Sequence, residues 1–142
     1  MVLSVALQSQ CTLSNGITGT DSEGSQTNFA GSLGLRFTVN SPIEVTRLGA
    51  FDSGLNGITS NITVGIVDNS GVVKVGPIIF TPGLGMYDGP FLMNGGFIPV
   101  TLPPGTYYIV AFWFNAQNPN GNTFSGDLAP TTNTGGGLIT YN

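Results

Sequence analysis

The sequence predicts an all-β domain, a two-sheet antiparallel β-sandwich of jelly-roll type with about eight strands. Short apolar segments rich in β-branched and aromatic residues alternate with turn signals along the whole chain. The 22 glycines and 9 prolines interrupt the chain too often for helices, and strong helix formers are scarce. Residues 106–114 contain no charge, Gly or Pro, which is typical of a well-packed central strand.

The first third of the chain contains three candidate strands. Residues 2–8 alternate in polarity and predict a first strand, and the polar residues 14–31 predict a loop or surface arm. Residues 33–39 also alternate and predict a half-buried strand, which the turn signal 40–42 ends. Residues 43–51 should return as the next strand. Its apolar positions change parity, which predicts a bulge at Thr46-Arg47.

Turn signals separate the remaining predicted strands from one another. Asp68-Asn69-Ser70-Gly71 predicts a tight hairpin between strands 62–66 and 72–80, and Pro77 marks the second of these as an edge strand or a break. Pro103-Pro104-Gly105 turns the chain into the central strand, residues 115–137 form a second polar loop, and residues 138–141 form a last strand. We expect one domain over 1–142, with a strand and polar arm at 1–31 and the sandwich core at 32–142.

The central strand is predicted to be apolar on both faces. One face carries Tyr107, Ile109, Ala111 and Trp113, and the other carries Tyr108, Val110, Phe112 and Phe114. Only one face of a strand can point into a core between two sheets. The other face must therefore meet a folded-over loop, a ligand or another subunit, because a large uncovered apolar patch is unusual on a monomer.

The charge and cysteine content of the chain limit its possible partners and its cellular location. Charged residues make up 7% of the chain, against about 25% in an ordinary soluble domain. The basic residues are only Arg36, Arg47 and Lys74, and the net charge is -4, which argues against nucleic acid or an anionic membrane as a partner. No apolar run is long enough to span a bilayer. Cys11 is the single cysteine, so the chain cannot form an intrachain disulfide. From the low charge content we expect an extracellular or cell-surface location.

The residues available for catalysis are few. There is no His and one Cys, which excludes His-assisted nucleophiles and His-ligated zinc. Asp52 and Asp68 each follow a strand and could approach each other as a hydrolytic carboxylate pair, but an Asp in the sequence Asp-Asn-Ser-Gly is far more often a turn residue that bonds its own backbone. We predict that the protein is not an enzyme.

A calcium site is the metal chemistry that the sequence best supports. Asp52, Asn56 and the carbonyl groups of their Gly-rich loop are hard oxygen ligands of the type that Ca²⁺ prefers. An ordinary turn accounts for the same residues. We expect no other cofactor.

Aromatic side chains offer a second kind of site. Trp113 with Tyr107, or Tyr87 with Phe91, could form a flat platform that stacks on the apolar face of a sugar ring. The alternative is that these side chains belong to the core.

Four segments resemble, in the same order, a domain-of-unknown-function family of bacterial secreted and cell-surface proteins, many of which carry a C-terminal sorting anchor. These segments are 33–52 (LGLRFTVNSPIEVTRLGAFD), 63–68, 99–107 and 135–139. The resemblance covers roughly residues 30–142 and implies an extracellular β-sandwich with no established catalytic residues. Members usually continue beyond the position of Tyr141-Asn142, and residues 2–8 are not part of the family pattern.

From these observations we expect a non-catalytic extracellular structural or adhesive module that self-associates into a filament, coat or array, possibly through strand exchange. The alternative is a carbohydrate-binding module. The expected partners are other copies of the chain and, in the alternative, glycans, with no nucleic acid and no membrane insertion. The residues expected at the self-association interface are Leu3, Val5, Leu7, Tyr108, Val110, Phe112 and Phe114.

Overall fold

The computed structural model describes residues 15–19, 24, 26–27, 31–122 and 131–142. These residues form antiparallel β-sheets with one short 3-10 turn, η1 (Ser53–Leu55), and no α-helix, which confirms the all-β prediction. No helix among them is long and apolar enough to cross a bilayer. The strands are β1 (Ile17–Gly19), β2 (Ser32–Val39), β3 (Ile43–Val45), β4 (Leu48–Phe51), β5 (Ile62–Asp68), β6 (Val73–Phe80), β7 (Met86–Asp88), β8 (Phe91–Asn94), β9 (Val100–Leu102), β10 (Gly105–Phe112), β11 (Thr131–Thr132) and β12 (Ile139–Tyr141).

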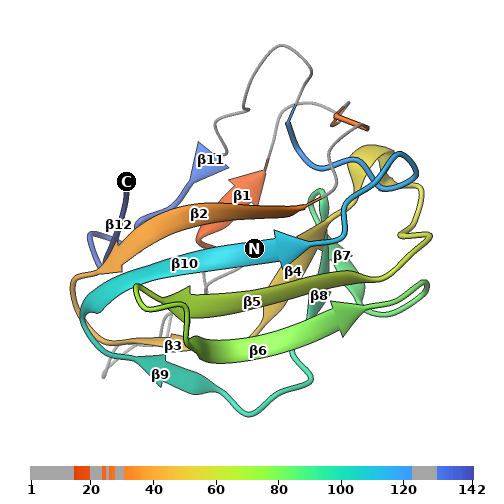
Figure 1. Cartoon of the computed structure of the whole chain (residues 1–142). Coiled ribbons are helices and arrows are strands. Elements are labelled where there is room, and N and C mark those ends of the chain that lie inside the picture. The colour runs from red at the N-terminus through yellow and green to blue at the C-terminus, as the bar shows by residue number, and fades with distance from the viewer. Residues whose placement is uncertain (1–14, 20–23, 25, 28–30, 123–130) are drawn as a thin grey trace.

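The largest sheet has five strands in the order β12-β2-β10-β5-β6 (Figure 1). Strand β10 is the middle strand, as the apolar run 106–114 predicts. Tyr107 of β10 lies opposite Phe37 of β2 and Asp68 of β5, and Ile109 lies opposite Leu35 and Ile66.

The remaining strands form three smaller sheets, with the orders β4-β8-β7, β3-β9 and β1-β11. Strands β3 and β4 follow each other along the chain but have different partners, because the strand is interrupted at Thr46-Arg47. The predicted parity change is therefore present, since Val45 and Leu48 are both buried. The cause is a break between two short strands rather than a bulge within one.

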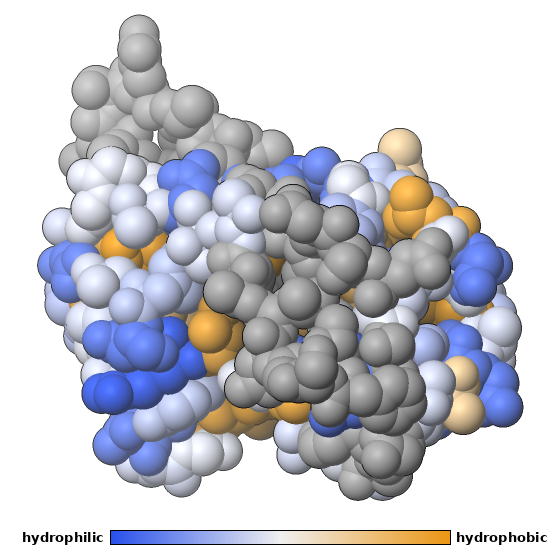
Figure 2. All heavy atoms as spheres, turned by 90° about the horizontal axis from the view of Figure 1, so that it is seen from above, coloured by the Kyte–Doolittle hydropathy of each residue, from blue (hydrophilic) through white to orange (hydrophobic). Residues whose placement is uncertain are grey.

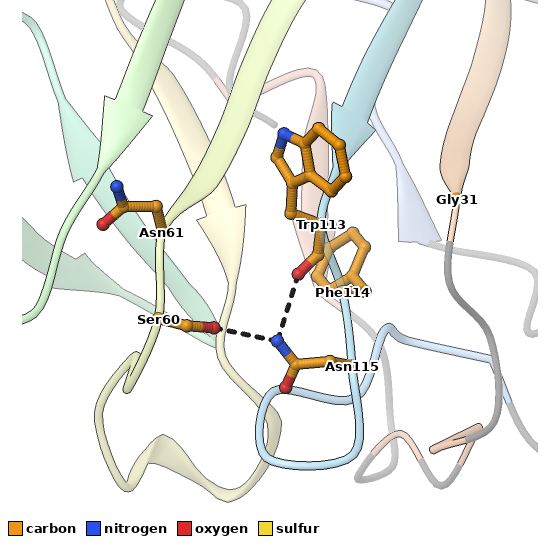
Figure 3. A pocket seen from close by; sticks show the side chains of 6 residues that line it. All are labelled: Gly31, Ser60, Asn61, Trp113, Phe114 and Asn115. Atoms are coloured by element: carbon orange, nitrogen blue, oxygen red, sulfur yellow. Dashed lines mark hydrogen bonds between the residues drawn. The ribbon is translucent and has the colours of Figure 1, made fainter.

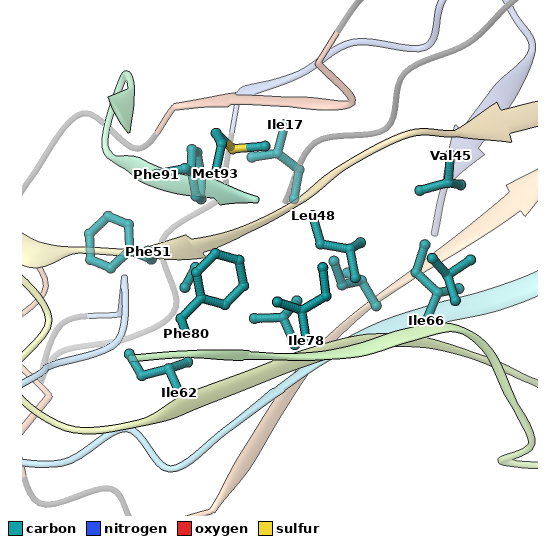
Figure 4. Close-up of a cluster of buried hydrophobic side chains, with 14 of the residues drawn as sticks. Ile17, Val45, Leu48, Phe51, Ile62, Ile66, Ile78, Phe80, Phe91 and Met93 are labelled. Atoms are coloured by element: carbon teal, nitrogen blue, oxygen red, sulfur yellow. The ribbon is translucent and has the colours of Figure 1, made fainter. Parts of the chain in front are cut away.

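The hydrophobic core lies between the five-stranded sheet and the strands β3, β4 and β8. Side chains from the two sides point toward each other in Figure 4, and all of them are buried. The five-stranded sheet contributes Ile62, Ile66, Ile78 and Phe80, and the facing strands contribute Val45, Leu48, Phe51 and Met93.

Two predicted turns are corners between sheets. Strand β2 pairs with β10, whereas β3 pairs with β9, so the chain changes sheet at 40–42 and again at 103–104. The register continues across both corners, with Val39 opposite Gly105 and Ile43 opposite Leu102. Residues 43–51 therefore do not return along 33–39, as the sequence suggested, but continue with a new partner.

The hairpin at 68–71 is confirmed. The Asp68 amide donates to the Val72 carbonyl at 2.9 Å, and the Gly71 amide donates to the Asp68 carbonyl at 2.9 Å. The Asp68 carboxylate accepts hydrogen bonds from the Ser70 and Val72 amides and pairs with Lys74 Nζ at 2.9 Å. These contacts lower the pKa of Asp68, and the hydrogen bond with Lys74 contributes most to the shift. Strand β6 is an edge strand of its sheet, as Pro77 predicts.

The two segments predicted as polar loops contact each other. Strand β1 pairs with β11, and Gln26 forms an isolated bridge with Asn120. The Asn120 side chain is fully buried, donates to Gln26 Oε1 at 2.9 Å and accepts from the Asn122 amide at 2.8 Å. The buried Asn120 side chain thus has hydrogen-bond partners in both segments. The predicted strand 2–8, with Leu3, Val5 and Leu7, and Cys11 lie outside the described residues.

Candidate functional site

The central strand ends in an unusual backbone conformation. Trp113, directly after β10, has a φ of 77°, a left-handed value that a bulky side chain rarely adopts. This change breaks the alternation of the strand. The Trp113 side chain is 68% exposed, whereas Phe114 is buried at 5%. The sequence prediction placed Trp113 with Tyr107 and Phe114 on the opposite face, and the structure corrects both assignments.

The predicted platform of Trp113 with Tyr107 is not formed. Tyr107 is buried, stacks on Phe37 with ring centroids 5.8 Å apart, and donates its hydroxyl hydrogen to the Pro103 carbonyl at 2.9 Å. Its ring therefore belongs to the core and cannot meet a ligand beside Trp113.

The second predicted platform is not formed either. Phe91 is buried and packs edge-on against Phe51, with ring centroids 6.1 Å apart. Tyr87 is 49% exposed, but its hydroxyl donates to the Asp52 carboxylate. Tyr87 is therefore held by Asp52 within the fold, and Phe91 is too deeply buried to extend an aromatic surface beside it.

A shallow pocket of about 360 Å³ lies beside Trp113 (Figure 3). Three segments that are distant in sequence build it, namely the residues before β2, before β5 and after β10. The lining residues are Gly31, Ser60, Asn61, Trp113, Phe114 and Asn115, none of which is charged.

Hydrogen bonds among asparagine and serine residues fix the base of this pocket. The Ser60 hydroxyl accepts from Asn115 Nδ2 at 2.8 Å and from Asn118 Nδ2 at 2.6 Å. The buried Asn118 also accepts from the Thr59 amide at 2.8 Å, and Asn115 accepts from the Asn118 amide at 3.0 Å. The loop after β10 is thereby tied to the segment before β5, which holds the pocket walls in place.

The second candidate surface is the side of the five-stranded sheet that faces away from the core, called the outward face here. Along β10 its residues alternate with the buried Tyr107 and Ile109. Two rows of paired positions cross the sheet, one joining Tyr108, Val67 and Val73, and the other joining Phe112, Thr63 and Ile79. Val73 is 49% exposed and Ile79 52%.

Val110 lies at the centre of the outward face. Its cross-strand neighbours are Gly34 on β2 and Gly65 on β5, which have no side chains to cover it. Arg36, opposite Tyr108, is the charged residue at the paired positions of β2, β10 and β5 on this face. An antiparallel sheet usually presents polar side chains on its solvent side, and here Ser32, Arg36 and Thr38 of β2 do so, whereas Tyr108, Val110 and Phe112 of β10 are apolar.

Other exposed apolar residues are dispersed. Seen from above, hydrophobic residues form separate patches among hydrophilic ones (Figure 2). Single exposed apolar residues such as Ile98 and Met86 are normal on a protein surface. They do not by themselves indicate a site.

The predicted calcium ligands have other roles or lie apart. Asp52 is buried, and its Oδ2 accepts hydrogen bonds from the Gly57 amide at 2.9 Å and from the Tyr87 hydroxyl. The bond to Asp52, with burial, raises the pKa of Tyr87. Asn56 is exposed at the end of η1. Within the described part of the chain, no three His, Cys, Asp or Glu side chains gather as metal ligands do, and the calcium site stays a prediction.

A second polar cluster joins the segment before β1 to the three-stranded sheet. Arg47 Nη2 donates to Asp88 Oδ2 at 2.9 Å and to Asn15 Oδ1 at 3.0 Å, and Asn15 Nδ2 donates to Asp88 Oδ2 at 2.8 Å. All three residues thus have partners within the fold, which gives the cluster a structural role.

Interface predictions fall into three groups. Tyr108, Val110 and Phe112 lie together on the outward face, Phe114 is buried in the core, and Leu3, Val5 and Leu7 are outside the described residues. Sequence reasoning missed Ser60, Asn115 and Asn118, because amide side chains in a polar loop give no signal of their partner. Comparisons of the chain with protein-family models, curated proteins and solved structures found no match. The resemblance to the secreted and cell-surface family therefore stays a prediction.

Proposed function

We propose that the protein is a non-catalytic extracellular structural or adhesive module that self-associates through the outward face of its five-stranded sheet. The observation that carries the proposal is the apolar character of this face around Val110, with Tyr108 and Phe112 on the same strand. Contiguous apolar surface of this kind marks interaction sites more often than free surface.

A second copy of the chain is the occupant that charge favours. The chain carries a net charge of -4, so two copies repel each other at long range. The outward face adds no carboxylate to this repulsion, because Arg36 is the charged residue at the paired positions of β2, β10 and β5 that face outward. Two identical faces can meet about a two-fold axis, the commonest symmetry of homo-oligomers.

Strand exchange would use the side of the sheet at β2. Strand β12 pairs with β2 only at Phe37, Thr38 and Val39, and no described strand pairs with residues 32–35 on that side. The opposite edge, β6, contains Pro77, which lacks the amide hydrogen that strand addition needs. A donated strand would therefore add beside Ser32–Leu35 rather than along β6.

We further infer a jelly-roll-like sandwich of two layers. The continuous chain from β3 to β4 would join the sheets β3-β9 and β4-β8-β7 into one layer, and the five-stranded sheet would be the other. The core between them supports this reading. We propose no catalytic residues, no nucleic-acid partner and no membrane insertion. A structural Ca²⁺ at Asp52 and Asn56 remains a separate proposal.

Sedimentation velocity over a concentration series, with negative-stain electron microscopy, tests the proposed function. We expect the sedimentation coefficient to rise with protein concentration and the assembled fraction to show a regular oligomer or polymer. A single monomeric species at every concentration, with no particles larger than one chain, would overturn it.

A further inference from the structure

We infer that the pocket beside Trp113 binds an uncharged pyranose ring of a glycan. This inference does not depend on self-association, because the pocket is lined by residues at the end of β10 and not by the outward positions Tyr108 and Val110. The two surfaces can therefore be tested separately.

The first argument is the exposed indole. Trp113 is 68% exposed, although such a large apolar side chain gains free energy from burial. Its backbone also holds a left-handed φ of 77°, a conformation that is sterically unfavourable for a residue with a side chain. Strained residues that stay exposed concentrate at ligand sites, so the conformation points to a role in binding.

The second argument is the chemistry of the lining. Trp113 supplies the exposed aromatic surface, and Ser60 and Asn61 supply a hydroxyl and an amide group, whereas the Asn115 amide already donates to Ser60 and to the Trp113 carbonyl. A pyranose ring has an apolar C–H face for stacking and hydroxyl groups that exchange hydrogen bonds with amides. A charged ligand would find no ion partner among the lining residues.

The third argument is preorganisation and access. Ser60, Asn115 and Asn118 hold the base of the pocket through hydrogen bonds of 2.6–2.8 Å, so little ordering would accompany binding. In Figure 3 the bond from Asn115 to Ser60 lies between Trp113 and Asn61, and the Asn61 amide is turned to the side away from the indole. Asn61 is exposed, and no hydrogen bond joins its amide to another described residue, which leaves that group available to a ligand.

Intrinsic fluorescence provides a direct test, because Trp113 is the only tryptophan of the chain. The full chain, at a concentration where it is monomeric, is titrated with glucose, galactose, mannose, xylose, N-acetylglucosamine and short neutral oligomers of each. We expect at least one sugar to give a saturable change in emission with a Kd of about 1 mM or tighter. Glucuronate at the same concentration should bind more weakly than glucose.

Variants separate binding from folding. Asn61→Ala should weaken sugar binding by about threefold or more, while Val72→Ala, an exposed change at the distant hairpin, should leave it unchanged. No saturable emission change with any sugar of the panel would overturn the inference. So would equal effects of the two variants, or an emission change that follows protein concentration and not sugar, since Trp113 would then contact another copy.

Discussion

Trp113 and Phe114 are consecutive residues with opposite exposure, since the side chain of the first is 68% exposed and that of the second is buried at 5%. The left-handed backbone at Trp113 produces this reversal, because it ends the alternation of β10 at Phe112. The same residue therefore ends the central strand, sends Phe114 into the core and forms one wall of the pocket.

Substitutions at position 113 test the strain. We expect Trp113→Gly to unfold at a higher urea concentration than Trp113→Ala, with a difference of about 1 kcal/mol in the free energy of unfolding. Glycine adopts a positive φ at no steric cost, whereas alanine keeps the penalty. Equal stability of the two variants would contradict a left-handed conformation at this position.

Removal of the Asn118 side chain tests the polar network at the pocket. Asn118→Ala leaves the Thr59 amide without its 2.8 Å acceptor and deprives Ser60 of one donor. We expect the free energy of unfolding to fall by about 1–3 kcal/mol and sugar binding to weaken as well. The neighbouring exposed Gln117→Ala is the matched control and should change neither quantity. A stability of Asn118→Ala equal to that of the control would show that the network is not formed.

Alkaline pH should destabilise the fold through Tyr87 and Tyr141. The hydrogen bond to Asp52 raises the pKa of Tyr87, and burial raises the pKa of Tyr141, above the ordinary value of 10.0. A raised pKa means that the folded state favours the neutral phenol. This contribution to stability is complete below pH 10 and is lost as the pH rises through the folded-state values.

Chemical denaturation between pH 8 and pH 12 measures this effect. Tyr87→Phe and Tyr141→Phe should each reduce the loss of stability above about pH 10, and the double variant should reduce it further. At neutral pH, Tyr87→Phe should cost about 1 kcal/mol, since Asp52 loses a donor. A slope above pH 10 that is identical in the wild type and the double variant would contradict the assignment.

Acid pH should loosen the hairpin at Asp68. The lowered pKa of this carboxyl means that the folded state favours the carboxylate, so its contribution is complete above the ordinary value of 3.8 and is lost as the pH falls through the lower folded value. Asp68→Asn keeps an oxygen acceptor for the Ser70 and Val72 amides but removes the charge beside Lys74. We expect a smaller loss of stability below pH 4 in this variant by thermal denaturation. Lys74→Ala should resemble it, and unchanged acid sensitivity in both would contradict the ion pair.

Local patterns predicted the strands better than their partners. The alternation of 33–39, the Asp68 turn, the edge position of Pro77 and the central place of 106–114 all agree with the structure. Each depends on residue chemistry within a few positions. The turn signal at 40–42 predicts a return of residues 43–51, but the chain changes sheet there, because a turn signal does not specify which strand comes next.

The candidate site was less predictable, for two physical reasons. The left-handed φ at Trp113 has no sequence signal, because such values are expected at glycine or asparagine rather than at tryptophan. The pocket and the bridge between Gln26 and Asn120 join segments far apart in the chain, and neutral amides carry no charge pattern that would pair them. Only Tyr108, Val110 and Phe112 could be placed together on one surface from the strand period alone.

The central claim is that copies of the chain associate through the face around Val110, and light scattering of matched variants tests it most directly. Val110→Lys places a charge between Gly34 and Gly65, whereas Ile98→Lys adds the same charge at a residue that is 87% exposed outside the sheets. We predict that the mass of the wild type and of Ile98→Lys rises with concentration, and that Val110→Lys associates at least about tenfold more weakly. A wild type that stays at 14.7 kDa throughout, or a Val110→Lys variant that assembles like the control, would contradict the account.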